Sequence, residues 1–250
     1  MHRYLRMVKI SYFISYVLSF TQVANVTRER CGGQGYLSCN RFGTFIGSAH
    51  AAMTAEGDNS VLMQKVAKER LVMFKPSKLE KPASTDLLDT GYIEFLFKKR
   101  EQMLFMELGG KMMKAGKKGM FETWMYNESD LIQAAAHSYG DRLISETFHS
   151  TIANAEASLQ PVLTKLFQLY QLSNVEKNLG WYLTTKTLTL EQGQQVTPLC
   201  AQLCRELAPH SLPLVEAFGI TDTMLSAPIA LDWVKYNVDN FEGEVEKAKL

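Results

Sequence analysis

The sequence predicts an all-α protein made of helical bundles, with no substantial sheet. Apolar residues recur at steps of three and four over most of the chain, which is typical of helices that bury one face. No stretch shows the sustained alternation of apolar and polar residues that predicts strands. With 250 residues, of which 46% are hydrophobic, the chain can bury a core sufficient for one large domain or two small ones.

The first predicted helix occupies the N-terminal 30 residues. A signal peptide is the alternative, because basic residues precede the apolar run 10–20, but no convincing small-residue cleavage site follows. The run is also too short to span a bilayer. We favour an amphipathic core helix that ends at Arg28, Glu29 and Arg30. Its apolar positions recur at steps of three and four and are Ile10, Phe13, Ile14, Val17, Leu18 and Val23.

Further helices are predicted along the rest of the chain, at 60–74, 92–108, 129–157, 161–172, 190–207 and 212–218. The helix at 92–108 is expected to break at Gly109 and Gly110. The helix at 129–157 is expected to be capped by Asn127 or Ser129. In the 60–74 helix the predicted apolar side holds Val61, Leu62, Val66, Leu71 and Val72.

Residues 75–84 have the composition of a linker, with two prolines and several charges. We therefore expect a domain boundary there, between residues 1–77 and 78–250.

Charge and cysteine content exclude several kinds of function. Lys and Arg number 27 against 26 Asp and Glu, so the formal charge of +1 gives no overall case for a nucleic-acid or membrane-surface partner. The four cysteines form no CxxC pair and have no histidines in metal-ligand spacing, so no metal site is predicted. Unpaired cysteines suit a reducing, intracellular compartment.

A glycine-rich turn follows the first helix. Gly32, Gly33 and Gly35 interrupt the helical pattern, and glycine permits a positive φ or a close approach of backbone to a ligand. A helix C-cap is the plain structural interpretation, and the same turn would bring backbone amides near a cofactor. Arg30 lies beside the turn, where a positive charge would suit a pyrophosphate.

Glu56 is the candidate catalytic residue. It follows the small apolar residues Ala51, Ala52 and Ala55 and precedes Gly57. In such surroundings a carboxylate would be poorly solvated, which would raise its pKa and make it a usable base near neutral pH. Taken without its neighbours, Glu56 would instead be a solvated glutamate at the start of a helix.

Two motifs resemble those of a known family. They are RxxCGGxGYxxxNR, at residues 28–41, and EGDNxVLMQ, at residues 56–64. Both are similar to motifs in the C-terminal half of peroxisomal acyl-CoA oxidases, flavoproteins related to the acyl-CoA dehydrogenases. Residues 134–148, 163–172, 214–230 and 232–244 resemble the C-terminal helical domain that the oxidases have and the simpler dehydrogenases lack.

The resemblance implies a reaction and a cofactor. Glu56 would be the base that removes the pro-R α-proton of a fatty acyl-CoA while the β-hydrogen leaves as hydride to FAD. Dioxygen would then reoxidise the flavin and yield hydrogen peroxide and a trans-2-enoyl-CoA. Gly32, Gly33, Arg30 and Asp58 are the residues expected to contact FAD.

The resemblance also implies an architecture and partners. Residues 1–77 would be the C-terminal part of the first, FAD-contacting helical domain, and residues 78–250 the C-terminal helical domain. We expect a homodimer, or a dimer with a full-length oxidase. Ala248-Lys249-Leu250 resembles the tripeptide that a peroxisomal import receptor recognises, so the expected location is the peroxisome.

Two alternatives to this function are open at the sequence level. A full oxidase begins with a helical and a β-barrel-like domain that are not in this sequence. One alternative is therefore a non-catalytic helical fragment that dimerises with a full-length oxidase. The other is a dehydrogenase relative that passes electrons to a carrier protein.

Overall fold

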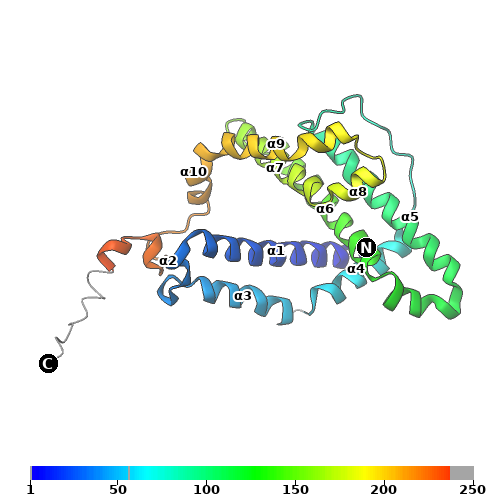
Figure 1. Cartoon of the computed structure of the whole chain (residues 1–250), viewed down its shortest axis with the longest axis horizontal. Helices are drawn as coiled ribbons and strands as arrows, with labels where there is room; N and C mark the ends of the chain where they lie inside the picture. The colour runs from blue at the N-terminus through cyan, green and yellow to red at the C-terminus, as the bar shows by residue number, and fades with distance from the viewer. Residues whose placement is uncertain (1, 56, 237–250) are drawn as a thin grey trace. The chain divides into compact units, whose positions relative to one another are not determined.

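The computed structural model describes residues 2–55 and 57–236, and every regular element among them is helical (Figure 1). The predicted all-α class is thereby confirmed. The described residues divide into two compact units. The first holds residues 2–15 and 58–212, the second holds residues 16–55, 57 and 213–236, and α1 (His2–Arg30) contributes to both.

The first unit is a bundle of helices that begin at polar capping residues. Asp58 caps α4 by accepting a hydrogen bond from Val61 N. Asp89 caps α5 in the same way, and Thr189 forms a capping box with Gln192 at the start of α9. Its elements are α4 (Asn59–Met73), α5 (Thr90–Glu122), the π-helical η2 (Thr123–Asn127), α6 (Ser129–Ala153), α7 (Gln160–Lys177), α8 (Leu179–Thr184), α9 (Leu190–Leu207) and η3 (Ala208–His210).

Two apolar cores stabilise this bundle. One lies where α1, α4, α5 and α6 meet, around Ile14, Phe105 and Ile132. The other joins the first turns of α5 to α7, α8 and α9, around Leu96, Tyr182 and Val196. Because α5 supplies side chains to both cores, the two are parts of one folded body.

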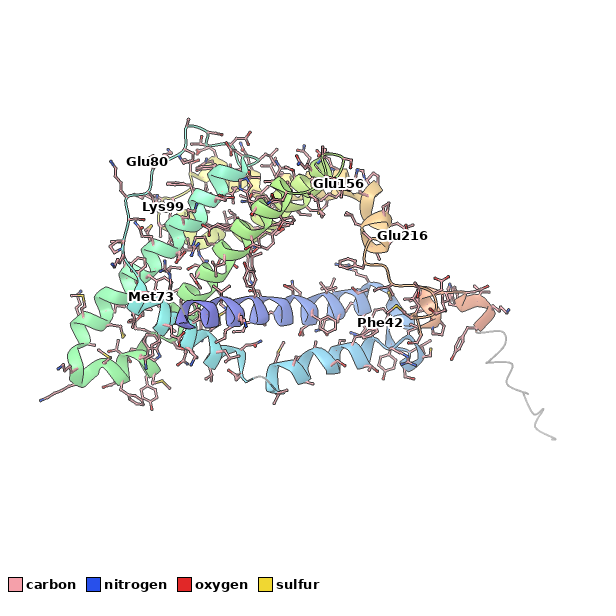
Figure 2. All side chains as sticks on the ribbon, turned by 180° about the vertical axis from the view of Figure 1, so that it is seen from behind. Phe42, Met73, Glu80, Lys99, Glu156 and Glu216 are labelled. Carbon is pink, nitrogen blue, oxygen red and sulfur yellow. The ribbon has the colours of Figure 1, made fainter. Side chains whose placement is uncertain are left out.

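The second unit is smaller. It contains the remainder of α1, then α2 (Gly32–Tyr36), the 3₁₀ turn η1 (Ser38–Asn40) and α3 (Phe42–Ala55). From residue 213 it also contains the end of α10 (Ser211–Glu216) and the 3₁₀ turn η4 (Pro228–Ala230). Figure 2 labels Phe42 at the start of α3. No helix in the described residues is long and apolar enough to cross a bilayer.

The predicted break at Gly109 and Gly110 is wrong. α5 continues through both glycines to Glu122, and its one non-helical residue is Gly116, with φ 59° and ψ −176°. Glycine inside a helix costs only about 1 kcal/mol relative to alanine, and packing of α5 in two cores outweighs that cost. Gly109 faces Leu71 of α4, which approaches to 3.6 Å of the position a Cβ would take.

Two details of α6 also differ from expectation. Neither Asn127 nor Ser129 caps it, because the N-cap residue is Glu128 and it makes no side-chain capping bond. The helix ends at Ala153 rather than at residue 157. A turn through residues 154–159 then leads to Pro161 in the first turn of α7, as predicted.

The apolar faces were only partly predicted. In α1, Ile14 is fully buried, whereas Leu18 and Val23 are exposed in the second unit. Of the predicted apolar side of α4, Val61 and Val72 are exposed, and the buried face is formed by Met63, Val66 and Ala67. Periodicity locates a helix, but small residues such as alanine decide how close its neighbours come.

A buried charge cluster links α4, α5 and α6. The Glu101 carboxylate is 4% exposed and accepts hydrogen bonds from Arg70, at 2.8 Å, and from Arg142. The Arg142 guanidinium also pairs with Glu146 and lies over the Tyr139 ring. Burial alone would lower the pKa of Arg142, but these carboxylates more than offset it, so the pKa is raised. The Arg142 guanidinium therefore stays charged at neutral pH.

A second polar group on α6 begins one residue before Arg142. Asp141 is 3.6 Å from Arg100, and its side chain is 22% exposed. Burial raises its pKa to about 6 despite the attraction of Arg100 and Lys177. Burial also lowers the pKa of His137, an effect that the charges of Lys177 and Arg100 reinforce.

We expect the stability of the chain to depend on pH through Asp141. Its pKa is higher when folded than the ordinary 3.8, so folding favours the protonated form. The stabilisation is full below about pH 4 and is lost as pH rises through about 6, a difference of roughly 2–3 kcal/mol. In urea unfolding between pH 4 and 7, Asp141→Asn should remove this slope. His137, which has the opposite slope, is present in both proteins and cancels in the comparison.

The exposed Ser150 on the same helix provides a control. Ser150→Ala removes no titratable group and should leave the pH profile of unfolding as it is in the wild type. Identical profiles for the wild type and Asp141→Asn would contradict the role of Asp141.

Candidate functional site

The glycine-rich turn reverses the chain after α1. Cys31 N still donates to Thr27 O at 3.0 Å, and Gly32 then takes φ 56°, which ends α1 and starts α2. Gly35 packs against the end of α1 so closely that a Cβ would lie 2.0 Å from the Arg28 carbonyl oxygen. The backbone of the chain itself therefore requires glycine at positions 32 and 35.

Gly33 differs from its two neighbours. It is exposed, its φ is not positive, and an added Cβ would meet nothing within 4 Å. Local folding therefore gives no reason for glycine at this position. The backbone at Gly33 is open to approach by another molecule.

Arginines surround the turn. Arg28 and Arg30 lie in the last turn of α1, where a positive charge also complements the helix dipole. Arg30 is exposed, and so is Arg41, which begins the next segment with φ 59°. The predicted grouping of Arg30, Gly32 and Gly33 is thus present in one short segment of the second unit.

Asn40 is a site residue that the sequence analysis did not identify. It is 1% exposed, and its side-chain amide donates to Gln34 O at 2.9 Å and to Gln34 Oε1 at 3.2 Å. Its own Oδ1 accepts from Ile229 N at 2.9 Å. The available signal was its place in the motif RxxCGGxGYxxxNR of residues 28–41, in which Asn40 is a specified position.

α3 leads from this turn toward the second motif. Its 14 residues, Phe42–Ala55, span ~20 Å at 1.5 Å per residue, so the two motifs lie near opposite ends of the helix. Glu56, the predicted base, lies outside the described residues. Of the three alanines that precede it in the prediction, Ala51 and Ala55 are exposed and Ala52 is half-buried.

The two residues after Gly57 begin the second stretch of the first unit, residues 58–212. Asp58 is exposed and its carboxylate is engaged as the cap of α4, with Oδ1 at 3.0 Å from Val61 N. Asn59 differs, because both polar atoms of its side chain are buried and have no hydrogen-bond partner in the described part of the chain. An unsatisfied buried amide costs roughly 1–3 kcal/mol, so Asn59 is suited to a partner from elsewhere.

A separate cleft lies in the first unit between α1 and α6. It has a volume of about 680 Å³ and is lined by residues such as Val8, Tyr12 and Asn154. The hydroxyl of Tyr12 donates to Leu143 O at 3.3 Å across this cleft. Among the predicted site residues that the structure describes, none lines it.

Two family comparisons match separate parts of the chain. Residues 93–232 match the family described as acyl-CoA oxidase. Residues 12–71, which include the glycine-rich turn and the EGDN motif, match the acyl-CoA oxidase C-alpha1 domain.

Individual relatives agree with these matches. Peroxisomal acyl-coenzyme A oxidase 2 of Arabidopsis thaliana is 27% identical over 253 residues, covering 89% of this chain and 36% of its own length. Acyl-CoA oxidase 1 of Yarrowia lipolytica has the same fold, with a TM-score of 0.85 and 20% identity over 97% of this chain and 40% of its own. Acyl-CoA oxidase-1 of Caenorhabditis elegans, crystallised with FAD and ATP, gives a TM-score of 0.84 and 15% identity over 100% of this chain and 41% of its own.

The chain spans about a third of the length of the curated relatives that it matches. The acyl-CoA oxidase match alone covers more than half of its 250 residues. The chain therefore belongs to the acyl-CoA oxidase family.

Proposed function

We propose that this chain works in an FAD-dependent acyl-CoA oxidase of peroxisomal fatty-acid β-oxidation. The reaction converts a fatty acyl-CoA and O₂ into a trans-2-enoyl-CoA and H₂O₂. The observation that carries the proposal is the open backbone at Gly33, in a turn flanked by arginines, within a chain of this family.

The residues of the turn fit the pyrophosphate portion of FAD. Gly33 leaves room for a close approach, and Arg30 supplies an exposed positive charge next to it. The C. elegans relative whose crystal structure contains FAD shares the fold of this chain. When bound, FAD provides the two-electron acceptor that the protein side chains lack. Gly32, Gly33 and Arg30 would hold the cofactor in place.

Glu56 would be the general base of the reaction. Its carboxylate would take the α-proton of the thioester, which is acidic because the adjacent carbonyl stabilises the charge left on carbon. Asn59 lies three residues farther on with a buried and unsatisfied amide, so it is suited to orient Glu56 or the thioester. Asp58 would then act as the cap of α4 and fix the start of this helix, in addition to its proposed contact with FAD.

Other parts of the protein must keep the base dry. Ala51 and Ala55, which precede the EGDN loop, are exposed to solvent. A second subunit, as a homodimer or as a full-length oxidase, would cover this loop and raise the pKa of Glu56 by desolvation. Ala248-Lys249-Leu250, which lies outside the described residues, would direct the assembly to the peroxisome, as expected for relatives named as peroxisomal.

Two glycine variants test the cofactor site. Gly33→Val should weaken FAD binding at least tenfold while the helical content and melting temperature stay close to those of the wild type, because a Cβ at this exposed position would meet no atom within 4 Å. Gly35→Ala should instead destabilise the fold, because its Cβ would overlap the Arg28 carbonyl. Binding is measured by titration with FAD and followed by flavin absorbance, and folding by circular dichroism.

These measurements separate an FAD-binding oxidase from a non-catalytic partner of a full-length oxidase. Equal FAD affinity in the wild type and Gly33→Val would contradict the proposed cofactor site. A folded wild-type chain that binds a full-length oxidase but no FAD would favour the non-catalytic partner instead.

A further inference from the structure

We propose that Asn40 is a positioning residue that ties a segment near the C-terminal end of the described chain to the glycine-rich turn. The segment, residues 226–231, is named here the C-terminal strap. Both views show the chain around η4 lying beside α2 in the second unit (Figures 1 and 2). The consequence for the cofactor rests on the proposed function, whereas the tie itself does not.

The tie is made by one side chain that bonds in two directions. Asn40 Oδ1 accepts from Ile229 N at 2.9 Å, although the two residues are 189 positions apart. Asn40 Nδ2 donates to the Gln34 carbonyl at 2.9 Å, one residue after Gly33. Since Asn40 is 1% exposed, water does not compete for these bonds.

The local bonding of the strap leaves Ile229 available for this role. Ala230 N donates to Ala227 O and Leu231 N donates to Pro228 O, each at 3.0 Å, so these amides are satisfied within the strap. Proline at 228 has no N–H to donate. The Ile229 amide is thus the donor of the strap that reaches the turn.

Asparagine suits this position for a chemical reason. Its amide carries both a donor and an acceptor, so it can serve the Gln34 carbonyl and the Ile229 N–H at the same time. Aspartate would keep the acceptor and lose the donor, whereas alanine would lose both. Comparison of asparagine, aspartate and alanine at position 40 therefore distinguishes the bond to the Ile229 N–H from the bond to the Gln34 carbonyl.

The test measures amide hydrogen exchange in the full 250-residue chain without FAD. In Asn40→Ala, the Ile229 amide should exchange about tenfold faster than in the wild type, because it loses its acceptor. In Asn40→Asp the protection of Ile229 should be largely restored, while amides 34–37 of the turn should exchange faster. Asn25→Ala is the matched control, because Asn25 donates to Thr21 O within its own helix and should leave Ile229 unchanged.

Two results would overturn the proposal. One is equal exchange at Ile229 in the wild type and Asn40→Ala. The other is that the Ile229 amide exchanges as fast in Asn40→Asp as in Asn40→Ala.

FAD titration then tests the consequence for the turn. Asn40→Ala should raise the Kd for FAD severalfold, and Asn25→Ala should not. Absence of FAD binding in the wild type would refute the proposed function and leave the exchange result interpretable.

Discussion

Replacement of Glu56 by glutamine should lower acyl-CoA turnover by about 10²–10⁴-fold, the range typical of losing a general base. Glutamine keeps the size and hydrogen-bonding ability of the side chain but cannot accept the α-proton. Binding of the acyl-CoA should therefore stay within about twofold of the wild type, so that the loss falls on kcat. The direct measurement is exchange of the α-proton with D₂O, followed by mass spectrometry under anaerobic conditions.

Glu29→Gln is the control for the change in charge. Glu29 is exposed in the last turn of α1 in the same unit, so its replacement should leave α-proton exchange unchanged. Equal exchange rates in the wild type and Glu56→Gln would remove Glu56 from the mechanism.

The second large effect concerns stability rather than chemistry. Glu101→Gln should lower the free energy of unfolding by about 2–4 kcal/mol, because two arginines lose the carboxylate that they share. Arg70 and Arg142 keep their contacts with aromatic rings, and Arg142 keeps its ion pair with Glu146. The loss of stability is therefore smaller than if each arginine were left buried with no partner. Urea unfolding followed by circular dichroism measures the change.

Glu107 on the same helix provides the comparison. It pairs with Lys111 at 3.2 Å on the surface and is 52% exposed, so Glu107→Gln should cost less than about 0.5 kcal/mol. A loss of the same small size in Glu101→Gln would show that the buried cluster does not stabilise the bundle.

Much of the fold could be predicted from local patterns. The bounds of α9 are those predicted, because Thr189 and Gln192 form a capping box with an apolar face behind it. The extent of α5 could not be predicted, since the cost of Gly109 and Gly110 is small beside the packing of a helix in two cores. Which face of α4 is buried was also set by its neighbours.

The candidate site was predictable where a short motif carries it. Glycine is required at position 32 by a positive φ and at position 35 by a close approach to the Arg28 carbonyl. A glycine-rich pattern in the sequence suggests both requirements. Asn40 is a position of the first motif, but its bond to Ile229 was not predictable, because the two residues are 189 positions apart. The exposure of Ala51 and Ala55 was missed because small apolar residues also line surfaces that another subunit covers.

The most direct test of the proposed function is the product balance of the FAD-loaded protein. The purified chain, alone and in complex with a full-length oxidase, is supplied with a fatty acyl-CoA and O₂, and enoyl-CoA and H₂O₂ are measured together. An acyl-CoA oxidase forms the two in equal amounts, and both should fall together in Glu56→Gln and Gly33→Val. Enoyl-CoA without peroxide would indicate a dehydrogenase, and product formation that neither variant changes would contradict the assignment of the reaction to this chain.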